Sequence, residues 1–295
     1  MTVPIIFCIS DLSGKYWPNL AVAIESVLVN SAESHVIFVL HDETMNQEAK
    51  EALVLIASSH KAKLNFIKLK LPEFFDDCDF GYFSHASIFR LAIPFIFKDY
   101  EQVVYLDADL IFHGVEINEL IMTAPQSVIC AVLDPYIGRS QKHRDQLQHL
   151  NLDASSYFNS GVLLMRPKQM DSNLINIFSV FLKENPALAH PDQDFLNFVF
   201  KDVWGKLDAK FNQQACTFDQ SLFKPLSSYW GKVIHYAGRV KPLEGHIAPA
   251  FIPFWMYAKT PLILKATQAF DSHPLSLLEP DKDNKDVVYA NKYKR

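Results

Sequence analysis

Two aspartates directly follow an apolar run and could hold a divalent cation. Asp107 and Asp109 come after Val103–Leu106, with Ala108 between them. Two carboxylates this close repel each other unless a cation neutralises them. A hard divalent metal ion does so and leaves coordination positions for phosphate oxygens. The pattern indicates a metal and phosphate site or, in its plainer interpretation, a turn that happens to contain two aspartates.

A second polar run, residues 235–242, also follows a short apolar segment. His235 offers an imidazole nitrogen, which favours Mn²⁺ over Mg²⁺. Gly238 would let backbone N–H groups approach a phosphate closely, and Lys241 can neutralise phosphate charge. Taken alone, His235 is more often a hydrogen-bonded histidine at a strand end, and Lys241 a solvated charge.

Three further polar features have both a functional and a structural interpretation. Asn159 precedes an apolar run, where its amide could bind a sugar hydroxyl or simply form a turn. Arg90 lies in a helical pattern before the aspartate pair and could contact a substrate or brace the helix through an ion pair. The run Asp192, Gln193, Asp194 could face a cleft, whereas Asp192 could also cap a helix.

Strand and helix patterns alternate along the first half of the chain. Apolar runs predict strands at Ile5–Ile9, 36–40, 63–69 and Val103–Leu106, and helical patterns separate them at 20–29, 47–57 and 84–92. This order predicts an α/β fold with a mostly parallel sheet and helices on both faces. Ligands bind at the carboxyl edge of such sheets, where Asp107 would lie.

The second half is less regular. We expect strands at 128–133, 161–165 and 233–235, helices at 173–183 and 194–200, and a surface insertion at 134–151. Residues 1–265 are predicted to form one domain, followed by a tail at 266–295. The tail mixes lysines with aspartates, so it is either solvated and mobile or in contact with an anionic membrane surface.

Composition excludes several classes of protein. The 295 residues are 49% hydrophobic and carry a net charge of −5, which suits a globular core and gives no global positive field for nucleic acid. Cys8, Cys78, Cys130 and Cys216 show no CxxC pairing, which favours free thiols in a reducing compartment. We therefore expect a cytoplasmic protein that makes, at most, peripheral contact with the inner membrane.

Taken together, these motifs resemble glycosyltransferase family 8, which includes bacterial lipopolysaccharide galactosyl- and glucosyltransferases and the glycogenins. The resemblance covers residues 4–260. The matching positions, in chain order, are Tyr16, Ser26, Arg90, the pair Asp107 and Asp109, the run 158–162, Asp192 to Asp194, and the run 235–242.

The resemblance implies a GT-A fold and transfer of galactose or glucose from a UDP-sugar to a glycan acceptor, with retention at the anomeric carbon. It implies a Mn²⁺ site, with Mg²⁺ as the alternative ion, formed by Asp107, Asp109 and His235. The implied donor contacts are Asp11, Tyr16, Arg90, Asp107, Ala108, Asn159, Gly238 and Lys241. Asp192, Gln193 and Asp194 are the candidate catalytic residues, and Asp134 is the candidate acceptor contact. The aromatic segment 251–257 is a second acceptor candidate, unless it is core or faces a membrane.

Two other functions fit parts of the pattern. Phosphatases of the haloacid dehalogenase type also place an Asp-x-Asp after a buried strand, but usually after the first strand, and they leave residues 235–242 unexplained. A non-catalytic UDP-sugar-binding protein would share the fold. Sequence does not choose between a protein nucleophile, for which Gln193 and Asp194 are candidates, and front-face attack by the acceptor.

Overall fold

The computed structural model describes residues 2–75, 85–186, 188–216, 220–238, 240–244 and 248–258. The predicted tail at 266–295 lies outside these residues, as do Cys78 and Ser84, the residue at which the predicted helix 84–92 begins.

Four parallel strands form one half of the main sheet, as predicted. They are β1 (Ile5–Ile9), β2 (Val36–His41), β3 (Lys63–Lys68) and β4 (Val103–Leu106), with β1 between β2 and β4. The crossovers from β1 to β2 and from β2 to β3 are the helices α1 (Trp17–Val29) and α2 (Gln47–Ser59). Every residue of β1 and β4 is buried, which explains why both strands are continuous apolar runs.

The main sheet has seven strands in the order β3-β2-β1-β4-β7-β6-β8. The long strand β7 (Phe158–Met165) is antiparallel to both of its neighbours, β4 and β6 (Ile129–Leu133), and β8 (Trp204–Lys206) is parallel to β6. Because β7 alone is reversed, the residues at its start lie at the same edge as the residues that follow β4 and β6. This edge collects Asp107, Asp134 and Asn159.

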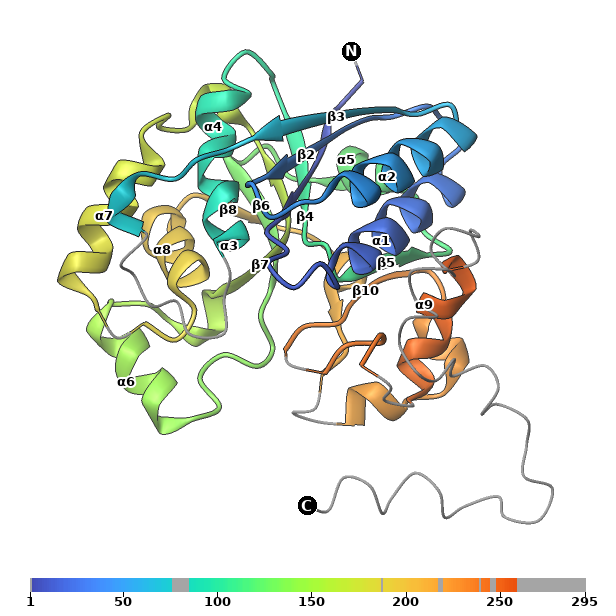
Figure 1. Ribbon diagram of the computed structural model, residues 1–295. Helices are drawn as coiled ribbons and strands as arrows, with labels where there is room; N and C mark the ends of the chain where they lie inside the picture. Colours follow the sequence, from blue (N-terminus) through green and yellow to red (C-terminus); the bar gives the residue numbers. More distant parts are fainter. Residues whose placement is uncertain are drawn as a thin grey trace.

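Helices cover both faces of the sheet (Figure 1). Ile5, Phe7 and Ile9 face the cluster formed with α1 and α2, whereas Ile6 and Cys8 face a second cluster. That second face is covered by α3 (Ala86–Phe89), the 3-10 helix η2 (Arg90–Ala92), α4 (Ile93–Ile96), α7 (Leu174–Glu184) and α8 (Pro191–Phe200). The mostly parallel α/β fold is therefore confirmed.

A smaller sheet, which the sequence patterns did not predict in full, lies beside α1. Its order is β5 (Leu110–His113), β10 (Lys232–His235) and β9 (Gln213–Gln214). Strand β10 runs antiparallel to β5 and parallel to β9. Helix α9 (Ile252–Tyr257), after the 3-10 helix η8 (Pro249–Phe251), closes this part of the described chain.

The aromatic segment 251–257 is core and not an acceptor surface. Phe251, Phe254, Trp255 and Tyr257 are all buried in the cluster that also contains α1 and β5. Burial removes these rings from contact with any sugar, so the acceptor interpretation of this segment is wrong.

Two helices of the structure were not predicted. The expected insertion at 134–151 contains a helix, α6 (Gln141–His149), whose N-cap Ser140 accepts a hydrogen bond from the backbone N–H of His143. Helix α5 (Ile117–Thr123) was not predicted either.

The remaining short helices are η1 (Glu73–Phe75), η3 (Ala154–Ser156), η4 (Pro167–Gln169), η5 (Ala209–Asn212), η6 (Gln220–Phe223) and η7 (Leu226–Tyr229). Within the described ranges, none of the helices has the length and apolarity needed to cross a bilayer.

Candidate active site

The aspartate pair lies where the chain passes from the large sheet to the small one. Asp107 still extends the main sheet, because its backbone N–H donates to the carbonyl of Gly161 at 2.8 Å. Asp109 directly precedes β5, and its carbonyl accepts a hydrogen bond from the backbone N–H of Tyr236 at 2.9 Å. The two carboxylates are thus held by different sheets.

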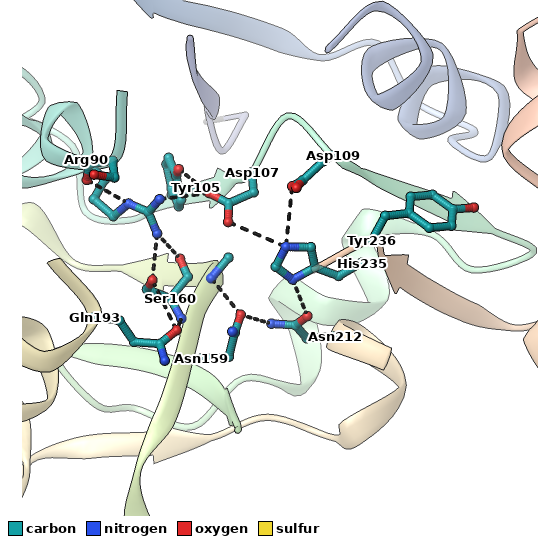
Figure 2. A network of polar contacts seen from close by, with 12 residues as sticks. Arg90, Tyr105, Asp107, Asp109, Asn159, Ser160, Gln193, Asn212, His235 and Tyr236 are labelled. Atoms are coloured by element: carbon teal, nitrogen blue, oxygen red, sulfur yellow. Dashed lines mark hydrogen bonds and ion pairs between the residues drawn. The ribbon is translucent and has the colours of Figure 1, made fainter. Parts of the chain in front are cut away.

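Strand register brings His235 to the same place. His235 pairs with Leu110 in the antiparallel β5–β10 ladder. Its ring nitrogen Nε2 lies 3.6 Å from Asp107 Oδ2 and 3.3 Å from Asp109 Oδ1 (Figure 2). One ligand atom from each of these three residues lies within 4.8 Å of the others, which fits a single divalent cation.

Gly161 leaves the space that this arrangement needs. A Cβ at this position would collide with the His235 ring and would lie 2.8 Å from Asp107 Oδ2. Residue 161 is part of β7, next to Asp107 in the ladder. The absence of a side chain here allows the imidazole and the carboxylate to face each other.

Arg90 and Tyr105 hold one oxygen of Asp107. The guanidinium Nη2 lies 3.0 Å from Asp107 Oδ1, and the Tyr105 hydroxyl donates to the same oxygen. Burial disfavours the charged guanidinium, but Asp107, Tyr105 and Asp192 outweigh this and raise the pKa of Arg90 above its usual range. Oδ1 is therefore occupied, and Oδ2 faces His235.

Lys241 reaches the other aspartate. Its Nζ donates to Asp109 Oδ2 and, at 2.7 Å, to the carbonyl of Tyr236. Burial alone would raise the pKa of Asp109. The positive charge of Lys241 and the contact with His235 have a larger, opposite effect, so the pKa of Asp109 is lowered overall. Nearby Gly238 is exposed and has a φ of +92°, and a Cβ there would meet nothing within 4 Å. Lys241 thus contacts one of the three candidate ligands, and Gly238 precedes it in the chain as an exposed residue.

A buried amide that the sequence analysis missed contacts the far side of the imidazole. Asn212, the last residue of η5, places its Oδ1 2.9 Å from His235 Nδ1. Its Nδ2 donates to Asn159 Oδ1 at 2.8 Å. Asn212 belongs to no motif and lies in a short irregular segment, so the sequence carried no signal for it.

The first turn of α8 places three polar side chains beside β7. The helix begins at Pro191 with His190 at the N-cap position, so the interpretation of Asp192 as the cap is wrong. Asp192 Oδ2 instead lies 3.3 Å from Arg90 Nη1 and 3.2 Å from Ser160 Oγ. Gln193 Oε1 accepts from the Ser160 backbone N–H at 2.9 Å. All three side chains of this turn are buried.

Asp194 is fully engaged within the protein. Tyr157 donates to its Oδ1 at 2.7 Å, and Gln146 Nε2 and the His190 backbone N–H donate to its Oδ2. Burial raises the pKa of this carboxyl. Through these hydrogen bonds, Asp194 fixes α8 against the start of β7 and against α6.

Asp134 lies next to Gln193 and is partly exposed. Its Oδ2 accepts from Gln193 Nε2 and from Asn159 Nδ2, both at 3.2 Å, while its Oδ1 accepts from the backbone of Tyr136 at 2.8 Å. The structure therefore brings together the candidate acceptor residue and a candidate catalytic residue.

Asp11 shapes the loop between β1 and α1. Its carboxylate accepts backbone hydrogen bonds from Lys15, Tyr16 and Trp17, at 3.1, 2.9 and 2.8 Å. Tyr16 is partly buried at the N-cap position of α1. The loop lies at the carboxyl end of β1, next to β4, and the predicted contacts of Asp11 and Tyr16 with a nucleoside remain predictions.

The sequence of this chain matches a known protein family. The model of the family described as "Glycosyl transferase family 8" matches residues 5–243. This chain belongs to glycosyltransferase family 8.

Curated relatives of this family 8 glycosyltransferase include enzymes named for lipopolysaccharide. It is 23% identical over 282 residues to the lipopolysaccharide glucosyltransferase WaaO of Escherichia coli K12, an alignment that covers 92% of this chain and 80% of WaaO. It is also 23% identical over 241 residues to the lipopolysaccharide 1,2-glucosyltransferase of the same organism, covering 78% of this chain and 70% of that protein.

A solved structure confirms the GT-A fold. The galactosyltransferase LgtC, crystallised in complex with donor and acceptor sugar analogs, superposes with a TM-score of 0.69 at 20% identity. The match covers 93% of this chain and 98% of LgtC. At this identity the likeness establishes the fold, and the chemistry of this family 8 member must be argued from its own residues.

Its residues fit a divalent cation. Two carboxylate oxygens and one imidazole nitrogen converge on one space, Gly161 keeps that space clear, and the second ring nitrogen of His235 is bonded elsewhere.

Proposed function

We propose that this protein is a metal-dependent, retaining glycosyltransferase that moves galactose or glucose from a UDP-sugar to a bacterial glycan. The observation that carries the proposal is the convergence of Asp107, Asp109 and His235 at the carboxyl edge of the sheet, with Lys241 beside them. Asp107, Asp109 and His235 would hold a divalent ion such as Mn²⁺, which would supply positive charge to stabilise the departing UDP.

Lys241 and Gly238 are proposed to hold the diphosphate. The ammonium group is a compact positive charge beside the candidate cation site, and Gly238 is exposed, with open space where a Cβ would lie. Asp11 and Tyr16, at the end of the neighbouring β1, are proposed to position the uridine, with the Asp11 carboxylate acting through the loop that it shapes.

Arg90, Asn159, Asp192 and Gln193 are proposed to line the donor sugar. They lie around the start of β7, where Arg90 is bonded to Asp107, Asp192 and Ser160. A guanidinium and carboxylates held rigidly by each other form a preorganised set of donors and acceptors for sugar hydroxyls. Galactose and glucose differ at one hydroxyl, which one such side chain could read.

The contacts of Gln193 and Asp194 favour front-face attack over a covalent intermediate. Both oxygens of Asp194 accept hydrogen bonds from the protein, so its carboxylate is already engaged in fixing α8. The Gln193 amide oxygen is a weak nucleophile and accepts from Ser160. In front-face attack, a phosphate oxygen of the leaving UDP accepts the proton of the acceptor hydroxyl.

Asp134 is proposed to bind the acceptor. It is the partly exposed carboxylate beside Gln193, so it can accept a hydrogen bond from a sugar hydroxyl at the reacting face. A lipopolysaccharide acceptor is suggested by the names of the relatives. The cytoplasmic location and the contact of the tail with the inner membrane stay predictions.

A donor screen tests the proposal. Purified protein is incubated with a panel of UDP-sugars and Mn²⁺, and UDP release is measured before and after addition of EDTA. We expect UDP-galactose or UDP-glucose to be consumed in the presence of Mn²⁺ and not after chelation.

Asp109→Asn is the matched variant, because the amide keeps the shape of the side chain and removes one negative charge at the cation site. Turnover should fall by orders of magnitude while the circular dichroism spectrum is unchanged. Normal turnover by this variant in Mn²⁺-free buffer would overturn the metal role. Hydrolysis of a generic phosphate ester would favour the phosphatase alternative, and donor binding without hydrolysis or transfer would favour the binding-protein alternative.

A further inference from the structure

The two ring nitrogens of His235 have different neighbours. Nε2 faces Asp107 and Asp109, whereas Nδ1 faces the side-chain oxygen of Asn212 at 2.9 Å. A neutral imidazole carries its proton on one nitrogen and a lone pair on the other, and only the nitrogen with the lone pair can bind a metal. The tautomer of His235 therefore decides whether the cation site has its nitrogen ligand.

The orientation of the amides next to His235 follows from a backbone group. The Gly161 N–H can only donate, and it points at the side chain of Asn159 at 2.9 Å, so that atom must be the amide oxygen. The same oxygen lies 2.8 Å from Asn212, which must therefore present its NH₂ group. Asn212 consequently turns its own oxygen toward His235 (Figure 2).

A carboxylate fixes the other end of the chain. Asn159 Nδ2 lies 3.2 Å from Asp134 Oδ2, and an ionised carboxylate only accepts hydrogen bonds. This contact demands the same orientation of Asn159 that Gly161 requires. Two independent groups thus impose one direction on the whole chain from Asp134 through Asn159 and Asn212 to His235.

Burial keeps the chain in that direction. Asn159, Asn212 and His235 are 8%, 3% and 4% exposed, so water cannot replace the contacts if an amide turns over. A turned amide of Asn212 would place NH₂ against Nδ1 and oxygen against oxygen, and unpaired polar groups in a buried site are costly.

We infer that Asn212 is a positioning residue that holds the Nδ1–H tautomer of His235, so that Nε2 offers its lone pair to the cation between the two aspartates. This inference rests on the metal site of the proposed function. It identifies Asn212 as the residue that sets the tautomer of the histidine ligand. Asn212 touches neither aspartate in the described contacts, and it acts through the imidazole alone.

The test measures Mn²⁺ affinity rather than turnover. Free Mn²⁺ is titrated by electron paramagnetic resonance in the presence of UDP, for the wild-type protein and for Asn212→Ala. Loss of a hydrogen-bonding partner behind a metal-binding histidine costs about 10–100-fold in metal affinity, and we expect a loss of this size. Affinity equal to that of the wild type would overturn the inference.

Two variants separate positioning from a general loss of structure. Gln214→Ala removes another buried amide from the same segment, one whose Nε2 has no hydrogen-bond partner among the described residues, and should leave Mn²⁺ affinity unchanged. Asn212→Asp keeps an oxygen toward Nδ1 but turns its second oxygen toward Asn159 Oδ1, so it should recover only part of the affinity that Asn212→Ala loses. Loss of the proton from Nδ1 of His235 in Asn212→Asp would contradict the role of the acceptor.

A spectrum reports the tautomer directly. Long-range ¹H–¹⁵N spectra of the metal-free, ¹⁵N-histidine-labelled protein at alkaline pH should show the His235 proton on Nδ1, and Asn212→Ala should remove this preference. A wild-type ring protonated on Nε2 would refute the inference. Failure of the wild type to bind Mn²⁺ at all would instead refute the metal site of the proposed function, so the two failures are distinguishable.

Discussion

At the scale of single residues, the site depends on a missing side chain as much as on those present. Gly161 lies between Asp107 and His235, and its φ is not in the left-handed region, so a larger residue is opposed by the neighbouring side chains and not by the backbone. The backbone conformation of Gly161 is open to residues with a side chain, but the space beside it has no room for a Cβ. The position is therefore a sensitive probe of the cation site.

Gly161→Ala should abolish Mn²⁺ binding while the protein still folds. The added methyl group would collide with the His235 ring and lie 2.8 Å from Asp107 Oδ2, so the ring must move away from the aspartates. Titration with Mn²⁺ measures the effect, and a urea denaturation curve reports the fold. Tight Mn²⁺ binding by this variant would show that the three ligands do not share one ion.

Gly231→Ala is the control for that substitution. Gly231 precedes β10 with a φ of +73°, and a Cβ there would meet nothing within 4 Å. The substitution should destabilise the protein by about 1–2 kcal/mol through backbone strain and leave Mn²⁺ affinity unchanged.

Residue types indicated the candidate ligands but not the groups that contact them. Asp107, Asp109, His235 and Lys241 were predictable because charged or ligating side chains follow apolar strands at a sheet edge. Asn212 and Tyr105 were not, since a buried amide in a 3-10 helix and a tyrosine within a strand look like ordinary core. Their roles depend on contacts between segments far apart in the sequence, with Asn212 bonded to His235 and Tyr105 to Asp107.

At the scale of elements, Asn197 is one of the side chains that fix α8 to the start of β7. Asn197 donates to the carbonyls of Phe158 and Gln193, at 2.8 and 2.9 Å, and accepts from the backbone N–H of Phe158 at 2.8 Å. The amide is 1% exposed and replaces the strand partner that the first residue of β7 would otherwise need. This contact sets the position of the polar turn at Asp192 to Asp194.

Asn197→Ala should lower the free energy of unfolding by about 1–3 kcal/mol for each backbone group left unpaired. Urea denaturation measures this loss. Asn176→Ala on the neighbouring α7 is the control, because this asparagine is exposed, and a surface substitution should stay within about 0.5 kcal/mol of the wild type. Equal stability of the two variants would show that Asn197 does not fix α8.

Local pattern identified the elements whose burial is simple. Strands β1 and β4 were predicted at their observed bounds because each is buried on both faces and reads as an apolar run. Helix α6 was missed because its one buried residue is Leu147, which leaves no apolar periodicity to recognise. Strand β5 was missed because it begins directly after Asp109, and sequence alone did not separate it from the site that it follows.

At the scale of the whole molecule, the candidate cation site joins two sheets. Asp107 continues the main sheet through its bond to Gly161, whereas His235 ends a strand of the small sheet, and Asp109 lies between them. An ion bound to all three side chains would therefore link the large α/β layer to the smaller C-terminal part. Such a link makes metal binding an event that the global stability of the fold can report.

Mn²⁺ should raise the midpoint of thermal unfolding in proportion to the logarithm of its concentration. An ion that binds the folded state stabilises it by about 2.7 kcal/mol at a concentration one hundred times its dissociation constant. For a domain of this size that corresponds to a rise of several degrees, since about 1 kcal/mol shifts the midpoint by roughly 2–4 °C. Addition of EDTA should reverse the rise. Asp109→Asn should show a much smaller rise in the midpoint with Mn²⁺, because its cation site has lost one of the negative charges that attract the ion. A Mn²⁺-dependent rise of equal size in this variant would place the ion elsewhere in the protein and separate metal binding from the aspartate pair.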